Sequence, residues 1–227
     1  MLVRSKNINL DVNGQETAVS AQYAMLADGR KASTDGMALD KAGVKLSDGA
    51  ISVDRKMHTN IPEIFAAGDV TGGPMFAHVA FAQGKLAAEN ALGKESEFDY
   101  SVIPQCINAI PEVAGVGLTE DEAQAKGHQL KIGRFPFAAN GMATILGERN
   151  GAIKVISDSK YGQVLGIHII GPQARNLIAE AALAMKMDAT PKEIGYTIHA
   201  HPTVTEALME AALDVTGETL HFVSANK

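Results

Sequence analysis

The sequence predicts an α+β fold, with most of its sheet in the second half of the chain. Three segments there, QLKIGRFPF, GAIKVISD and QVLGIHII, are rich in Val and Ile and bounded by Gly-containing turns, which indicates an antiparallel sheet. The clearest helices are ARNLIAEAALAMKM and TVTEALMEAALDV, because both carry apolar residues at helical spacing on an Ala- and Met-rich background. A third observation comes earlier in the chain, where EIFAAGD, a loop and MFAHVAFAQGKLAAENALG predict a strand, a loop and a helix that stops at Gly93.

The first hundred residues are less regular. Residues 5–26 alternate polar and apolar positions around the turn signal VNGQ, which predicts a small antiparallel patch. The following stretch is dense in Gly, Asp, Ser and Lys, so we expect irregular connection with a short strand at AISVD. The polar stretch GKESEFDYS places a domain boundary near residues 95–103, and Thr119 with Glu122 has the spacing of a capping box at the start of a helix.

Composition limits the classes of partner. With 227 residues, 46% of them hydrophobic and 20% charged, the chain can bury a sizeable core in one or two globular domains. The net charge of −6, without a basic block, argues against nucleic acid or an anionic membrane surface as a partner. No signal peptide or long apolar run is present, and the lone Cys106 agrees with a reducing compartment, so we expect a soluble, cytoplasmic protein.

The stretch TIHAHPTVTEALMEAALD allows three interpretations. Thr203 and Glu206 have capping-box spacing, which would make Glu206 the third residue of a helix preceded by Pro202. His199 and His201 could form a metal pair, but no other His or Cys lies at ligand spacing nearby, so we expect no metal. His201 could instead be a general base whose orientation is fixed by Glu206, because imidazole titrates near neutral pH. The capping and base interpretations are compatible.

Resemblance over nearly the whole chain favours the base. HAHPTVTEA resembles the terminal motif of dihydrolipoamide dehydrogenases, within the FAD-dependent pyridine nucleotide-disulfide oxidoreductases, and TNIPEIFAAGDVTGGPMFAHVA resembles their second flavin-contact segment. IPEVAGVGLTE, FPFAANGMA and QVLGIHIIGPQARNLIAEAALAM are similar to the same family's interface domain, in the expected order. Sister branches that resemble glutathione reductase usually lack the preceding His-Ala, and mercuric reductases lack the histidine, so the dihydrolipoamide branch fits best.

The resemblance implies roles for individual residues. His201 would accept a proton from the substrate dithiol, with Glu206 orienting it, and Asp69 after Gly68 would accept a hydrogen bond from a ribityl hydroxyl of FAD. The segment that begins a helix beside the flavin ring would comprise Met75, Phe76, Ala77 and His78, and Gly29 would lie near the nicotinamide nucleotide, NAD.

The same resemblance divides the chain and shows what it lacks. Residues 1–26 would be the remnant of an NAD-binding domain, 27–100 the C-terminal segment of an FAD-binding α/β domain, and 101–227 an antiparallel sheet with helices that forms the interface, or dimerisation, domain. The chain has one cysteine and therefore no redox CxxxxC pair, and it contains no GxGxxG fingerprint. It would match the C-terminal half only. LADGRKAST and Met142 also depart from the family pattern.

Three hypotheses follow. The chain could be part of a dihydrolipoamide dehydrogenase-like enzyme that passes electrons from a lipoyl-bearing protein through a disulfide and FAD to NAD+, inactive without a separate or missing N-terminal half. Its homodimer would form through residues 101–227, by the apolar faces of NLIAEAALAMKM and EALMEAALDV. It could instead be a stand-alone dimerisation or scaffold module without redox activity. A hydrolase or metal enzyme that uses the two histidines is the weakest hypothesis, because no Ser elbow or HExxH pattern is present.

Overall fold

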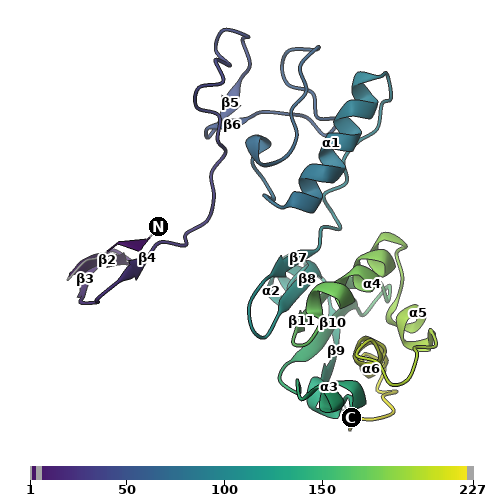
Figure 1. The fold of residues 1–227 in the computed structure, drawn as a ribbon. Helices are drawn as coiled ribbons and strands as arrows, with labels where there is room; N and C mark the ends of the chain where they lie inside the picture. The colour runs from purple at the N-terminus through teal and green to yellow at the C-terminus, as the bar shows by residue number, and fades with distance from the viewer. Residues whose placement is uncertain (1, 4–6, 224–227) are drawn as a thin grey trace. The chain divides into compact units, whose positions relative to one another are not determined.

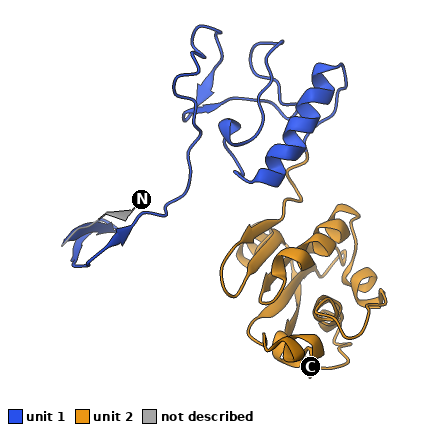
Figure 2. Ribbon diagram, viewed as in Figure 1, with its two compact units in different colours: residues 1–98 blue, residues 99–227 orange. Residues whose placement is uncertain are grey.

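The computed structural model describes residues 2–3 and 7–223 of the chain. These residues form two compact units, 1–98 and 99–227, which Figure 2 shows in different colours. The predicted division into three segments stays a prediction, and each unit is described by itself.

Unit 1 begins with short antiparallel pairs of strands. Two of them, β2 (Ile8–Val12) and β3 (Gln15–Val19), form a hairpin, and β1 (Leu2–Val3) pairs with β4 (Ala24–Met25). The hairpin turns through Asn13 and Gly14, whose φ angles of 56° and 81° suit the two-residue turn that Asn-Gly favours. The antiparallel patch predicted from the alternation is confirmed.

The rest of unit 1 contains one α-helix. A small pair of strands, β5 (Leu46–Ser47) and β6 (Ala50–Ile51), precedes the 3₁₀ turn η1 (Asp69–Thr71) and the helix α1 (Ala77–Ala91). The helix and its stop at Gly93, with φ of 94°, are confirmed. The strand predicted at EIFAAGD is wrong: its only described ladder contact is an isolated bridge between His58 and Phe65, and one bridge cannot make a strand.

Unit 2 is built on one antiparallel sheet, as the Val- and Ile-rich segments predicted. Its five strands lie in the order β7–β8–β11–β10–β9, and every neighbouring pair is antiparallel (Figure 1). They are β7 (Gln105–Ile107), β8 (Val113–Gly117), β9 (Leu130–Pro136), β10 (Ala152–Asp158) and β11 (Val164–Ile170). Alternation along β10 places Ile153 and Val155 on one face and Ile156 on the other, and all three are buried.

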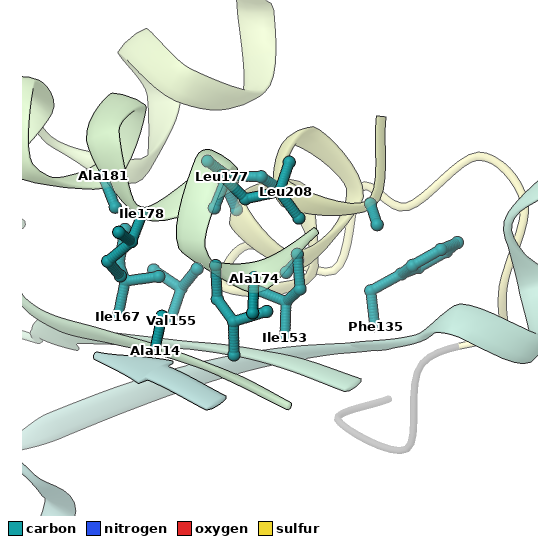
Figure 3. Close-up of a cluster of buried hydrophobic side chains, with 14 of the residues drawn as sticks. Ala114, Phe135, Ile153, Val155, Ile167, Ala174, Leu177, Ile178, Ala181 and Leu208 are labelled. Atoms are coloured by element: carbon teal, nitrogen blue, oxygen red, sulfur yellow. The ribbon is translucent and has the colours of Figure 1, made fainter. Parts of the chain in front are cut away.

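Two helices cover the first face of this sheet. They are α4 (Ala174–Lys186), which packs on β8 and β11, and α6 (Glu206–Asp214), which packs on β9 and β10. Figure 3 shows Leu177, Ile178 and Leu208 of these helices in one buried cluster with the sheet. The side chains of these helices that pack on the sheet are buried by the chain itself and cannot form the expected dimer contact. Leu183 and Met187 of NLIAEAALAMKM remain exposed, so a dimer contact through this segment stays a prediction.

Short helices complete unit 2. They are α2 (Glu120–Ala125), the 3₁₀ turn η2 (Phe137–Ala139), α3 (Gly141–Leu146) and α5 (Pro191–Tyr196). The capping box that the spacing of Thr119 and Glu122 predicted for α2 is confirmed. Buried Ala123 of α2 packs with Ile156 on the second face of the sheet. In the described part of the chain, no helix has the length and apolar character needed to cross a membrane.

A glycine sets the approach of α6 to the sheet. A Cβ at Gly133 in β9 would lie 2.0 Å from the carbonyl oxygen of Ala211 in α6, so no larger residue fits without moving the helix. On the same two elements, the backbone N–H of Arg134 donates to Oδ2 of Asp214 at 2.8 Å. These contacts fix α6, and with it the carboxylates that the helix carries.

Candidate functional site

His201 and Glu206 meet as the base interpretation requires. His201 Nδ1 lies 2.9 Å from Glu206 Oε1, and the second carboxylate oxygen of Glu206 accepts the backbone N–H of Thr203 at 2.8 Å. The imidazole is 75% exposed, whereas the Glu206 side chain is only 15% exposed. Because Nδ1 faces the carboxylate, Nε2 is the ring nitrogen offered to an external proton donor.

The environment keeps Glu206 ionised. Burial alone would raise the pKa of Glu206. The hydrogen bonds from the Thr203 backbone and from His201 together outweigh burial, so the pKa of Glu206 lies below its usual range. An ionised carboxylate accepts a hydrogen bond from Nδ1–H and thereby leaves Nε2 unprotonated in the neutral ring. The pair can therefore take up a proton at Nε2, and the carboxylate then stabilises the imidazolium.

The capping-box interpretation of Thr203 and Glu206 is corrected. Helix α6 begins at Glu206, with Thr205 as its N-cap residue, so Glu206 is the first helical residue and not the third. The hydroxyl of Thr203 donates to the carbonyl oxygen of Ala200 at 2.7 Å, which directs it away from the α6 backbone. Only one half of the box remains, the bond from the Thr203 N–H to Glu206.

His199 does not share a site with His201. Its Nε2 lies 3.0 Å from Glu180 Oε1, its Nδ1 lies 2.8 Å from the Thr197 carbonyl oxygen, and its side chain is 5% exposed. The hydrogen bond to Glu180 raises the pKa of His199 more than burial lowers it. His199 thus ties the loop to α4. In the part of the chain that the structure describes, no three His, Cys, Asp or Glu side chains are grouped to hold a metal.

A small cavity of about 200 Å³ adjoins the pair, lined by Phe135, Ala139, Asn140, Gly141, His201, Glu206, Glu210 and His221. Buried Asn140 supports it: its side chain caps α3 by accepting from the N–H of Ala143 at 2.8 Å and donates to the carbonyl oxygen of Thr203 at 3.1 Å. Asn140 was not among the site residues predicted from the sequence, although Asn before a helical segment is an N-cap signal. The residue holds the backbone of the His201 loop.

The residues predicted for FAD lie in unit 1. Gly68 has φ of 82°, a Cβ there would lie 3.1 Å from Ala80 Cβ, and its N–H donates to the buried Gln83 side chain at 2.8 Å. Asp69 opens η1. The ring of Phe76, the N-cap residue of α1, stacks on that of His78 with 5.2 Å between centroids.

Arg30, which the sequence analysis missed, connects these segments. One guanidinium nitrogen lies 3.9 Å from Asp69 Oδ2, and another donates to the backbone oxygen of Met75. Its neighbour Gly29 has φ of 119°, and a Cβ there would meet no atom within 4 Å. Gly29 is therefore required by its backbone conformation and not by a close neighbour, and its predicted contact with NAD stays a prediction. The signal for Arg30 was its position directly after Gly29.

The geometry of unit 1 suits part of a flavin. The Asp69 carboxylate is 45% exposed, so it can accept a hydroxyl hydrogen bond. Helix α1 starts at Ala77 without a side-chain cap, and so its first N–H groups can face an electron-rich group. These features fit a ribityl hydroxyl and a ring edge, the two contacts predicted for Asp69 and for residues 75–78.

Comparison with known proteins identifies the family. The dimerisation-domain profile of the pyridine nucleotide-disulphide oxidoreductases matches residues 103–212, and a second profile of pyridine nucleotide-disulphide oxidoreductases matches residues 3–84. The chain belongs to the pyridine nucleotide-disulphide oxidoreductase family. Members of this family use FAD and a nicotinamide nucleotide.

Two dihydrolipoyl dehydrogenases are among the proteins similar to the chain. A dihydrolipoyl dehydrogenase of Bacillus subtilis is 43% identical over 95% of the chain and 46% of its own length, and one of Thermus scotoductus is 45% identical over 93% and 46%. Thus the chain spans less than half the length of these relatives.

Two solved structures share the fold of the chain over about half of their own length. LpdA from Mycobacterium tuberculosis matches 93% of the chain and 46% of its own chain at 27% identity and a TM-score of 0.80. The HOCl-induced flavoprotein disulfide reductase RclA from Escherichia coli matches 92% and 48% at 26% identity and a TM-score of 0.79.

Proposed function

We propose that the chain supplies the proton-accepting base of a dihydrolipoyl dehydrogenase-like flavoenzyme. The observation that carries the proposal is the 2.9 Å contact between His201 Nδ1 and Glu206 Oε1, with the imidazole exposed and the carboxylate largely buried. That arrangement holds a base in one tautomer and presents its free nitrogen to a substrate. The similarity to dihydrolipoyl dehydrogenases supports a dihydrolipoyl group, carried on a protein, as the proton donor.

The chemistry of this base follows from the geometry. A thiolate is the reactive form of a thiol, so removing the proton from a dihydrolipoyl thiol activates it for attack on a disulfide. His201 Nε2 would accept that proton, and Glu206 would stabilise the resulting imidazolium. The redox disulfide of such an enzyme would have to come from outside this chain, whose only cysteine is Cys106. Burial raises the pKa of Cys106, so its thiol stays protonated near neutral pH.

The chain would also contribute part of a flavin site. Asp69 and the N-terminal turn of α1 would hold FAD, which when bound supplies two-electron transfer towards NAD+. Arg30 positions these two segments relative to each other through its contacts with Asp69 and the Met75 backbone. The phosphate-binding fingerprints are not among the 227 residues, so the polypeptide alone would bind FAD weakly and would not oxidise dihydrolipoamide.

A homodimer through residues 101–227 is part of the proposal, supported by the match to a dimerisation domain. The α4 and α6 faces that pack on the sheet are excluded as the contact. Apolar side chains that remain exposed in this unit are the candidates, and they include Leu183, Met187, Tyr196 and Ile198. The alternative of a non-redox dimerisation module has one observation in its favour, the absence of a dithiol from the sequence.

Two measurements test the proposal. The first is the visible absorption spectrum of the purified chain with its native mass and the masses of co-purifying proteins. A flavin band with a second polypeptide that carries a dithiol supports a split enzyme. A colourless dimer of the chain alone indicates either an enzyme fragment without its N-terminal half or the module, and the second measurement then decides between them.

The second measurement replaces the matching segment of the B. subtilis dihydrolipoyl dehydrogenase with this chain. In that chimera His201→Ala should lower turnover of dihydrolipoamide roughly 100-fold or more, as expected for the loss of a general base. The matched control is His128→Ala, because His128 also pairs with a carboxylate, Asp158, but does not line the cavity. Turnover near that of the unmodified chimera would remove His201 from the mechanism.

A further inference from the structure

A second histidine and glutamate pair lines the cavity beside His201. Glu210 lies one turn after Glu206 on α6, so the two carboxylates share a helix face, and both line the cavity with His201 and His221. His221 Nδ1 lies 2.6 Å from Glu210 Oε1. One histidine precedes the helix and the other follows it.

The Glu210 carboxylate is buried and depends on the end of the chain. Its side chain is 1% exposed, and the second carboxylate oxygen accepts the backbone N–H of Leu220 at 3.0 Å and, more weakly, that of His221 at 3.5 Å. An ionised carboxylate at this depth is costly without such partners. The hydrogen bonds described for Glu210 therefore hold residues 220–221 firmly against α6.

Further contacts make residues 216–223 a strap over this part of unit 2. Tyr196 donates its hydroxyl to Glu218 at 2.9 Å. The ring of Phe222 meets the buried ring of Phe135 edge-on, with 6.1 Å between centroids. Phe135 itself lines the cavity. His221 is the strap residue that lines the cavity, and the strap is anchored on both sides of it.

We propose that Glu210 and His221 are positioning residues for the His201–Glu206 pair. By holding His221 and the strap at the edge of the cavity, they keep water away from the Glu206 carboxylate and preserve its hydrogen bond to His201 Nδ1. The inference deepens the proposed function and, for its catalytic relevance, rests on it. A positive charge on His221 also acts in the same direction, because it lowers the pKa of Glu206.

The test measures the tautomer of His201 in the whole 227-residue chain by imidazole ¹⁵N NMR at pH 8. The unmodified chain should show His201 mainly as the Nδ1–H form. His221→Ala should shift it towards the Nε2–H form, because water then competes for Glu206. His221→Asn should restore the Nδ1–H form, since the Asn amide can donate to Glu210 from nearly the same place as the imidazole.

Two further variants separate positioning from general stability. Glu210→Gln keeps the size of the buried side chain and removes its charge, so it should shift the His201 tautomer in the same direction as His221→Ala. His128→Ala removes an equivalent histidine far from the cavity lining and should leave the tautomer unchanged. Amide spectra of β9–β11 report whether each variant is folded.

The outcomes are distinct. An unchanged His201 tautomer in folded His221→Ala and Glu210→Gln overturns the inference, and so does an equal shift in His128→Ala. The readout needs no turnover. If His201→Ala leaves the chimera active, the proposed function fails while the positioning of His201 by the strap stands or falls on its own measurement.

Discussion

The two units of this chain carry their functional residues on very different supports. In unit 2, Glu206 of the His201–Glu206 pair lies on helix α6, which packs on a five-stranded sheet over a large buried cluster. In unit 1 the residues predicted for FAD lie on a 3₁₀ turn and a helix start. One buried cluster described there comprises only Val44, Ile51 and Ala66. A proton-transfer pair can thus be positioned within unit 2 alone, whereas the flavin contacts depend on the bridging side chain of Arg30.

The same substitution in both units gives the largest expected contrast. Ile153→Ala, in the sheet core of unit 2, should lower the free energy of unfolding of that unit by about 3–5 kcal/mol, because a cavity remains among closely packed side chains. Ile51→Ala in unit 1 should cost less, about 2 kcal/mol, because fewer buried neighbours surround it and they can relax. Urea unfolding monitored by amide signals of each unit measures both values. Equal losses would erase the contrast.

Within unit 2, Glu206→Gln tests whether His201 needs the negative charge of the Glu206 carboxylate to act as a base. In the chimera it should lower turnover about 10-fold, less than His201→Ala, because an amide can still accept from His201 Nδ1 but stabilises an imidazolium poorly. The ratio of the two effects is read from kcat at saturating dihydrolipoamide. If Glu206→Gln lowers only the unfolding midpoint and leaves kcat unchanged, Glu206 serves the helix start and not the base.

The contrast between units also shows what the sequence could predict. Helices α4 and α6 follow from apolar residues at helical spacing, and strands β9, β10 and β11 follow from Val- and Ile-rich segments between Gly-containing turns. Helix α1 follows from its composition and its Gly stop. EIFAAGD failed as a strand because a strand needs a partner that local composition does not reveal.

The candidate site divides in the same way. His201 and Glu206 are close in sequence, and their spacing predicted a contact that the structure shows at 2.9 Å. The partners of the other three residues are distant in sequence: Arg30 contacts Asp69 39 positions away, Asn140 contacts Thr203 63 positions away, and His221 contacts Glu210 11 positions away. No periodic pattern marks such pairs. Helix α6 also starts later than its Thr-x-x-Glu spacing suggested, because the Thr203 hydroxyl binds a loop carbonyl. Side-chain contacts between loops and elements decide these features.

The contact between His199 and Glu180 should make the stability of unit 2 depend on pH. The folded-state pKa of His199 is raised above its unfolded value of about 6.5, so its contribution to stability is complete below that pH and is lost as pH rises through the raised value. Unit 2 should therefore lose about 1 kcal/mol between pH 6 and pH 9 that the His199→Gln variant does not lose. Urea midpoints at a series of pH values give this difference. Parallel pH profiles for the two proteins would assign the dependence to another group.

The smallest effect should come from a surface ion pair at the start of unit 2. Lys186 Nζ lies 2.5 Å from Asp99 Oδ2, and hydrogen bonds from Lys186 and Ser101 lower the pKa of Asp99 below its usual range. Its contribution is therefore present above about pH 4 and is lost as pH falls. Because both side chains are exposed, Lys186→Met should cost at most about 1 kcal/mol at neutral pH, and less in high salt. A loss as large as that of Ile153→Ala would mean that this contact, and not the sheet core, holds the first residues of unit 2 in place.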